Sequence, residues 1–238
     1  MKIALLGYGT MGREIEAIAL ERGHSIPIKI TSQNRSKLTN EDLANCDVAI
    51  DFSKPESAVD LIEWSLRNGV PTVSGTTGWL NDWEKIMALR ADVNGAFFYA
   101  SNFSLGVNVF FAVNQRLAEL MNPFEDYDVN MTEIHHTRKK DAPSGTAITL
   151  AEDVIERVER LQGWTSAREG EINKLPIRSE REGDVPGTHE IVYESFIDKI
   201  TLRHEAKNRK GFALGAVLAA EWLPGKTGSF GMKDLLNL

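Results

Sequence analysis

The sequence predicts an α/β protein, with a doubly wound parallel sheet in its first half and a β-rich α+β region in its second half. Two patterns lead to this prediction. Up to about residue 106, short apolar runs alternate with segments of helical periodicity, which is typical of a parallel sheet covered by helices. From residue 172 onward, short strand-like runs follow one another directly, as in an antiparallel sheet. The 238 residues suffice for one large domain or two modest ones.

The net charge, the cysteine content and the length of the apolar runs indicate which kinds of partner the protein has. The formal net charge of −7 argues against a general nucleic-acid binder, and an anionic substrate would need a local basic patch such as residues 138–140. The single cysteine, Cys46, excludes an intramolecular disulfide and fits a reducing compartment. No apolar run approaches the roughly 20 residues of a membrane span. We therefore expect a cytoplasmic protein that acts on a small molecule, with neither nucleic acid nor a membrane as its partner.

A glycine-rich loop follows the first predicted strand. Residues 2–6 form the apolar run of a buried parallel strand, and a helix is predicted over residues 14–22. The intervening G-x-G-x-x-G is, in this context, the dinucleotide-binding arrangement of a Rossmann fold, because its glycines let the backbone approach the pyrophosphate. An ordinary glycine-rich turn is the less favoured alternative. The candidate cofactor-binding residues are Gly7, Tyr8, Gly9, Thr10, Met11 and Gly12.

The loop after the second predicted strand, residues 26–30, bears on the choice of cofactor. NAD-specific folds often place an acidic residue there to bind the ribose 2′-hydroxyl. Residues 31–35 read T-S-Q-N-R, so no carboxylate repels a 2′-phosphate, and Ser32 is a candidate contact. We infer that NADPH is accepted, with NADH as an alternative. The competing interpretation is a solvated loop without a binding role.

Two more polar turns are predicted at the same edge of the sheet. Strands are expected over residues 48–52, 70–74 and 96–100, and helices to about residue 68 and over residues 79–91. Ser53 and Glu56 match a capping box at the start of the first of these helices. Because parallel sheets bind ligands at the carboxyl ends of their strands, the turns after the fourth and fifth strands add cofactor-binding candidates. These are Gly75, Thr76, Thr77, Ala100, Ser101, Asn102 and Phe103.

The second half begins with a helix predicted over residues 106–121 and a strand over residues 128–134. A helix is expected from Gly145 to about residue 161, followed by a surface connection over residues 162–173. The remaining expected elements are strands over residues 175–178, 189–196 and 199–204, a helix over residues 210–223, and a returning tail over residues 228–235.

The stretch over residues 133–147, E-I-H-H-T-R-K-K-D-A-P-S-G-T-A, combines features of an acid–base site. Histidine and lysine can deliver protons near neutral pH. Asp141 and Ser144 are suitable N-cap residues, and a helix N-terminus attracts anions. The stretch is therefore suited to hold an anionic substrate and to protonate it; a solvated basic loop is the competing interpretation. We reject a metal site for His135 and His136, because adjacent side chains at a strand end point opposite ways.

This stretch resembles the signature of the dihydrodipicolinate reductase family. Residues 75–78, 100–104, 106–108, 209–216 and 232–234 also resemble family motifs, so the likeness covers nearly the whole chain. The resemblance implies a Rossmann domain over residues 1–106 completed by residues 210–238. It also implies an inserted α+β domain over residues 107–209, which would bind substrate and join a homotetramer.

The resemblance also implies roles for particular residues. His135 would be a proton donor and acceptor, Lys139 the proton donor, and His136, Gly145 and Thr146 would hold the substrate carboxylates. NADPH or NADH would reduce 4-hydroxy-tetrahydrodipicolinate, or dihydrodipicolinate, in lysine and diaminopimelate biosynthesis. The phosphate loop is one residue shorter than in many family members, which leaves the cofactor preference open.

Two other functions are alternatives for this sequence. A related NADP-linked amino-acid dehydrogenase of the phosphorylating semialdehyde type needs a nucleophilic cysteine. The only cysteine, Cys46, lies in the nucleotide-binding half, away from the His–Lys stretch. A non-catalytic NADPH sensor on the same fold would not need His135, Lys139 and an anion-holding helix start together. Competition by dipicolinate would distinguish a substrate site from a sensor.

Overall fold

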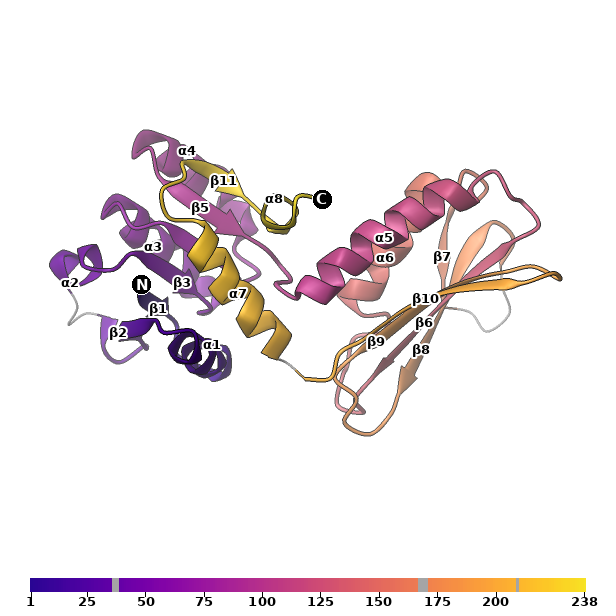
Figure 1. Ribbon diagram of the computed structural model, residues 1–238, viewed down its shortest axis with the longest axis horizontal. Helices are drawn as coiled ribbons and strands as arrows, with labels where there is room; N and C mark the ends of the chain where they lie inside the picture. Colours follow the sequence, from indigo (N-terminus) through magenta and orange to yellow (C-terminus); the bar gives the residue numbers. More distant parts are fainter. Residues whose placement is uncertain (36–38, 167–170, 209) are drawn as a thin grey trace. The chain divides into compact units, whose positions relative to one another are not determined.

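The computed structural model describes residues 1–35, 39–166, 171–208 and 210–238. The chain divides into two compact units, one formed by Met1–Asn108 with Lys210–Leu238 and the other by Val109–Arg209 (Figure 1). Arg209, which opens one of the family-like runs, lies outside the described residues. In the part of the chain that the structure describes, no helix is both long enough and apolar enough to cross a membrane.

The first unit contains a six-stranded sheet in the order β11-β5-β4-β3-β1-β2. All of its strand pairs are parallel, which confirms the predicted parallel sheet. Its strands are β1 (Lys2–Leu6), β2 (Ser25–Ile30), β3 (Val48–Asp51), β4 (Thr72–Ser74), β5 (Ala96–Tyr99) and β11 (Gly228–Phe230). The tail returns to the sheet as β11, which pairs with β5 and extends the edge.

Helices cover both faces of this sheet because its buried strands carry apolar side chains on both sides. On one face α1 and α7 pack against residues such as Ile3, Ile50 and Phe98. On the other face α3 and α4 pack around Phe97 and Trp79. The helical elements are α1 (Thr10–Glu21), α2 (Asn40–Ala44), α3 (Pro55–Arg67), the 3-10 turn Leu80–Asp82, α4 (Trp83–Asp92), α7 (Lys210–Trp222) and α8 (Met232–Leu236).

The expected capping box at the start of α3 is wrong. The N-cap residue is Lys54, and its side chain makes no capping hydrogen bond. The N–H of Ser53 donates instead to Oγ1 of Thr76, at 2.9 Å, and to Oδ1 of Asp51, at 3.2 Å. Ser53 therefore ties the loop after β3 to the loop after β4, at the edge where the cofactor is expected.

The second unit contains a five-stranded mixed sheet in the order β10-β9-β6-β8-β7. Its strands are β6 (Asp128–His135), β7 (Gly163–Thr165), β8 (Lys174–Arg181), β9 (Thr188–Glu194) and β10 (Lys199–Glu205). The expected antiparallel pairing is confirmed for β9 and β10, and β9 also pairs antiparallel with β6. It is wrong for β8, which pairs in parallel with both β6 and β7, because α6 (Gly145–Arg157) carries the chain back between β6 and β8.

Two boundaries in this unit differ from the sequence prediction. The helix α6 ends at Arg157, earlier than expected, because Val158 already has an extended backbone with φ −104° and ψ 93°. Part of the expected surface connection forms β7, while residues 167–170 lie outside the described residues.

One face of the mixed sheet is covered by helices. The α6 helix and most of α5 (Leu105–Met121) pack on this face, where the side chains of Met131, Ile177, Ile191 and Tyr193 form the core (Figure 1). Residues on this face alternate with more polar residues on the other, such as Thr132 and Glu190, which are paired across β6 and β9.

Candidate active site

The inward face of β6 changes from apolar to ionisable toward its end. Val129 and Met131 belong to the core, whereas Glu133 and His135, on the same face, end the strand. Neighbouring strands bring two more ionisable residues to this place. His189 of β9 lies opposite Glu133, and Arg181 of β8 lies opposite His135. Four ionisable side chains from three strands therefore meet at one end of the sheet.

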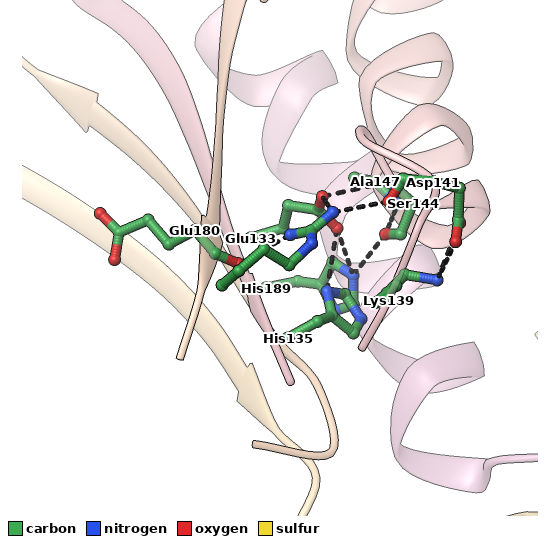
Figure 2. Close-up of polar contacts among 9 residues, drawn as sticks. Glu133, His135, Lys139, Asp141, Ser144, Ala147, Glu180 and His189 are labelled. Atoms are coloured by element: carbon green, nitrogen blue, oxygen red, sulfur yellow. Dashed lines mark hydrogen bonds and ion pairs between the residues drawn. The ribbon is translucent and has the colours of Figure 1, made fainter. Parts of the chain in front are cut away.

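Glu133 is the centre of this cluster, and its side chain is 0% exposed. Its Oε2 lies 3.1 Å from Nδ1 of His135. Its Oε1 accepts hydrogen bonds from Nη2 of Arg181, at 3.1 Å, and from the N–H of Ser144, at 3.2 Å (Figure 2). Burial alone would raise the pKa of the Glu133 carboxyl. Favourable contacts with His135, Ser144, Ser179 and Arg181 outweigh burial and hold that pKa well below its usual range.

His189 connects the cluster to the start of α6. Its Nε2 lies 3.2 Å from Oγ of Ser144, which caps the helix by accepting a hydrogen bond from the N–H of Ala147. The rings of His189 and His135 meet edge to face, with 5.1 Å between their centroids. Burial, followed by repulsion from His135, lowers the pKa of His189 to about 4. His189 is therefore neutral at physiological pH.

Lys139 lies in the loop between β6 and α6. Its Nζ donates to both carboxylate oxygens of Asp141, at 2.9 and 2.8 Å, and this contact lowers the pKa of the Asp141 carboxyl. Figure 2 shows Lys139 at the same end of the sheet as His135 and His189. Arg181 fixes the loop from the other side by donating to the carbonyl oxygen of Asp141 at 2.6 Å. The two predicted proton donors thus belong to one connected cluster.

The predicted carboxylate-holding residues lie around this cluster. His136 directly follows β6 and is half-buried, and Gly145 and Thr146 are the first two residues of α6. The N–H groups of these two residues precede the first hydrogen bond within the helix and face an anion favourably. A Cβ atom built on Gly145 would meet no heavy atom within 4 Å, so there is space beside this backbone.

In the other unit, the glycine-rich loop lies between β1 and α1. Thr10 and Met11 belong to the first turn of α1. Gly7 has a φ of +106°, which favours glycine. A Cβ atom on Gly12 would lie 2.5 Å from the carbonyl oxygen of Gly7, whereas one on Gly9 would meet nothing within 4 Å. The glycines at the two ends are thus required by packing, and the space beside Gly9 fits the close approach of a dinucleotide pyrophosphate.

Phe52, which follows β3, joins the three loops predicted to bind the cofactor. A Cβ atom on Gly75 would lie 2.2 Å from its ring, and one on Gly7 would lie 2.4 Å from its carbonyl oxygen. Its ring lies 5.6 Å from that of Phe103. Sequence reasoning missed Phe52, although its position directly after a buried strand was a usable signal.

The other predicted cofactor-binding residues differ in exposure. Thr77 and Ser101 are exposed, whereas Thr76 and Ala100 are buried, as is the ring of Phe103, which is 2% exposed. Tyr8 donates its hydroxyl to Glu16, and Oδ1 of Asn102 accepts from the N–H of Ser104 at 2.9 Å. Ser32 is exposed in the turn after β2, where the guanidinium of Arg35 stacks over Trp64 at 3.8 Å.

Sequence reasoning also missed Glu133, Arg181 and His189 in the second unit. The signal that could have found Glu133 is a charged residue at an inward position of an alternating strand. Glu133, His135 and His189 place possible metal-ligand atoms within 4.8 Å of one another. His136 is not one of these three, and the cation of Arg181 already contacts the Glu133 carboxylate.

A Rossmann unit with an open glycine-rich loop and a second unit with a buried acid–base cluster define an NAD(P)H-dependent oxidoreductase. Two family models identify it further. The model described as "Dihydrodipicolinate reductase, N-terminus" matches residues 1–103, and the one described as "Dihydrodipicolinate reductase, C-terminus" matches residues 106–236. The chain belongs to the dihydrodipicolinate reductase family.

Relatives agree with this assignment, and a solved structure shares the fold. A 4-hydroxy-tetrahydrodipicolinate reductase of Christiangramia forsetii is 52% identical over 100% of this chain and 98% of its own length. The Rickettsia bellii reductase is 38% identical over 95% of this chain and 90% of its own. A dipicolinate-bound dihydrodipicolinate reductase from Paenisporosarcina sp. TG-14 shares the fold, with a TM-score of 0.76, 22% identity and 98% coverage of both chains. These findings confirm the resemblance and the fold class predicted from sequence.

Proposed function

We propose that this protein reduces 4-hydroxy-tetrahydrodipicolinate to tetrahydrodipicolinate with NADPH or NADH, in lysine and diaminopimelate biosynthesis. The observation that carries this proposal is the clustering of His135, Lys139 and the start of α6 within one short stretch of chain. This stretch unites a proton donor, a cation and a helix N-terminus, which are the groups that a reducible dicarboxylate requires.

The cofactor would lie along the carboxyl edge of the parallel sheet. Bound NADPH or NADH would supply the hydride. Gly9 leaves room for the pyrophosphate, and residues 75–77 and 100–103 line the same edge. The loop after β2 has no acidic residue, and Arg35 provides a cation there, so we propose that NADPH is accepted. NADH remains the alternative.

The substrate carboxylates would be held by Lys139, His136 and the N–H groups of Gly145 and Thr146. Charge-assisted hydrogen bonds of this type contribute about 1.5–3 kcal/mol each. The solved relative that binds dipicolinate, a dicarboxylate, supports a ligand of this class.

Proton delivery would fall to His135 and Lys139. Hydride addition to a conjugated imine leaves an electron-rich carbon or nitrogen, which must then take a proton. The Lys139 ammonium both attracts a carboxylate and carries a transferable proton, and the imidazole of His135 can accept and donate a proton.

The division of labour between the two domains is also a proposal. Residues 1–106 with 210–238 would bind the dinucleotide, and residues 107–209 would bind substrate and form a homotetramer in the cytoplasm. The β9–β10 hairpin exposes 92% of the apolar side chain of Phe196. Light scattering should show a tetramer, and Phe196→Asp should dissociate it. A monomeric parent protein would contradict this proposal.

The function is tested by oxidation of NADPH and of NADH, with aspartate semialdehyde, pyruvate and a purified synthase generating the unstable substrate. Turnover is the expected result, and the ratio of the two kcat/KM values reports on the loop after β2. If the protein binds NADPH but turns over no substrate, and dipicolinate does not compete, the reductase proposal is overturned in favour of a sensor or a related dehydrogenase.

A further inference from the structure

We propose that Glu133 is a positioning residue, which holds the ring of His135 so that Nε2 is the nitrogen that exchanges a proton with the substrate. The proposal rests on the function proposed above, in which His135 is a proton donor. It assigns a role to a buried carboxylate that lies outside the predicted set of substrate-binding and catalytic residues.

The two nitrogens of the His135 ring have different surroundings. Nδ1 lies 3.1 Å from Oε2 of Glu133, so the carboxylate occupies this side of the ring. On the opposite side, a Cβ atom on Gly187 would lie 3.1 Å from Nε2. Because residue 187 is glycine, no side chain covers Nε2 there. Nδ1 therefore has a fixed carboxylate partner, whereas Nε2 faces a glycine, which has no side chain to cover it.

The carboxylate of Glu133 is itself held in place. Nη2 of Arg181 and the N–H of Ser144 both donate to Oε1, which leaves Oε2 directed at His135. The side chain of Glu133 is 0% exposed. Val129 and Met131 on the same face are apolar, so packing alone does not call for a charge at this position.

The consequence for chemistry follows from the charge of the carboxylate. At 3.1 Å an ionised carboxylate is attracted to an N–H and repelled by a lone pair, so Nδ1 carries a proton and the neutral ring has its lone pair on Nε2. When the ring is protonated, the carboxylate stabilises the imidazolium, and Nε2–H is the proton available for transfer. Among the described residues, Arg181 lies opposite His135 on β8 and the His189 ring meets the His135 ring edge to face, while Lys139 and His204 act on His189.

The same carboxylate links the proton donor to the carboxylate-binding residues. The N–H of Ser144 that donates to Oε1 immediately precedes Gly145 and Thr146. Glu133 thus sets the position of the His135 ring and of the α6 N-terminus from one buried point. A purely structural role would use only the contacts of Oε1 with Arg181 and Ser144.

Glu133→Gln separates the two roles. The amide oxygen can take the place of Oε1 and keep the contacts with Arg181 and Ser144. The amide NH₂ then takes the place of Oε2 and donates to Nδ1 of His135, so the proton of the neutral ring must move to Nε2. The matched control is Glu190→Gln, on the opposite face of the sheet, where the carboxylate pairs with Arg203 at 2.9 Å.

The experiment records the ¹⁵N resonances of the His135 ring, assigned by comparison with His135→Gln, in the full-length protein. We expect an Nδ1-protonated neutral ring in the parent protein and an Nε2-protonated ring in Glu133→Gln. The kcat should fall about 10- to 100-fold, which is less than the full loss of a general acid–base group, about 10²- to 10⁴-fold, because the imidazole itself is kept. The KM, and the Kd of dipicolinate, should stay within about threefold of the parent values. Glu190→Gln should match the parent in all of these.

An unchanged tautomer in Glu133→Gln, an unchanged kcat, or a loss confined to KM would overturn the proposal. If Glu133→Gln does not fold, the parent protein alone decides, because a neutral ring protonated at Nε2 contradicts the assignment. The activity assay of the parent protein distinguishes failure of the reductase proposal from failure of the Glu133 proposal. A parent protein without turnover overturns the reductase function, whereas the ring tautomer still reports on Glu133.

Discussion

The Nζ atom of Lys139 lies 2.9 and 2.8 Å from the two carboxylate oxygens of Asp141, two residues further along the chain. The Asp141 carboxylate therefore already binds the Lys139 ammonium, which is proposed to hold a substrate carboxylate. A dicarboxylate ligand would have to displace it, or share the ammonium with it, on binding.

We expect Asp141→Asn to tighten the binding of dipicolinate. Exposed ion pairs contribute up to about 1 kcal/mol, so the Kd should fall by up to about fivefold at low ionic strength. Isothermal titration calorimetry would measure it. The control is Asp184→Asn, which removes the partner of Arg138 at 2.8 Å and should leave the Kd within about twofold. Weaker binding in Asp141→Asn would show that Asp141 orients Lys139 instead of competing for it.

We expect Lys139→Ala to lose more kcat/KM than His135→Ala. The lysine substitution removes both a proton donor and the cation that attracts a carboxylate, whereas the histidine substitution removes a proton donor only. A loss of about 100-fold or more for Lys139→Ala is consistent with general acid catalysis combined with charge. Steady-state kinetics with the coupled assay measures both. Comparable losses, confined to KM, would contradict the assignment of Lys139 as a proton donor.

The parallel sheet of the first unit was predictable because each of its elements leaves a local signal. A buried parallel strand is an apolar run, and the glycine-rich loop directly follows the first of them. The loops at its carboxyl edge could therefore be located by residue number. Phe52 was missed, since its contacts with Gly7, Gly75 and Phe103 join three loops that are separate in sequence.

The acid–base cluster was only half predictable, for a physical reason. His135 and Lys139 lie within one short stretch, so a local pattern identifies them. Arg181 and His189 reach Glu133 only through strand pairing, and the parallel pairing of β8 with β6 depends on the crossover through α6. The local pattern of short successive strands indicated antiparallel neighbours, which would have placed these side chains elsewhere.

We expect acid to destabilise the protein partly through His189. Its pKa is about 4 in the folded protein, against about 6.5 for an unperturbed histidine. Between these values the unfolded chain binds more protons than the folded one, so the free energy of unfolding falls as the pH is lowered. The contribution of His189 to the free energy of unfolding is complete above about pH 6.5, and about 3 kcal/mol of that free energy is lost by about pH 4. Urea unfolding at several pH values would measure this loss.

The matched variant for this pH effect is His189→Gln, which removes the titrating group and can still form a hydrogen bond with Ser144. Its unfolding free energy should depend less steeply on pH between about 6.5 and 4. Equal slopes for the parent and His189→Gln would show that other groups carry the acid sensitivity.

Gly9 and Gly12 should respond differently to alanine. A Cβ atom at Gly12 would lie 2.5 Å from the carbonyl oxygen of Gly7, whereas one at Gly9 would meet open space. Gly12→Ala should therefore lower the free energy of unfolding by about 1–3 kcal/mol, the usual cost of overpacking. Gly9→Ala should unfold like the parent protein yet raise the Kd of NADPH about tenfold, since the methyl group would occupy the space proposed for the pyrophosphate. Denaturant unfolding and fluorescence titration of NADPH measure the two effects separately. Unchanged NADPH binding by Gly9→Ala would place the pyrophosphate elsewhere on the sheet edge.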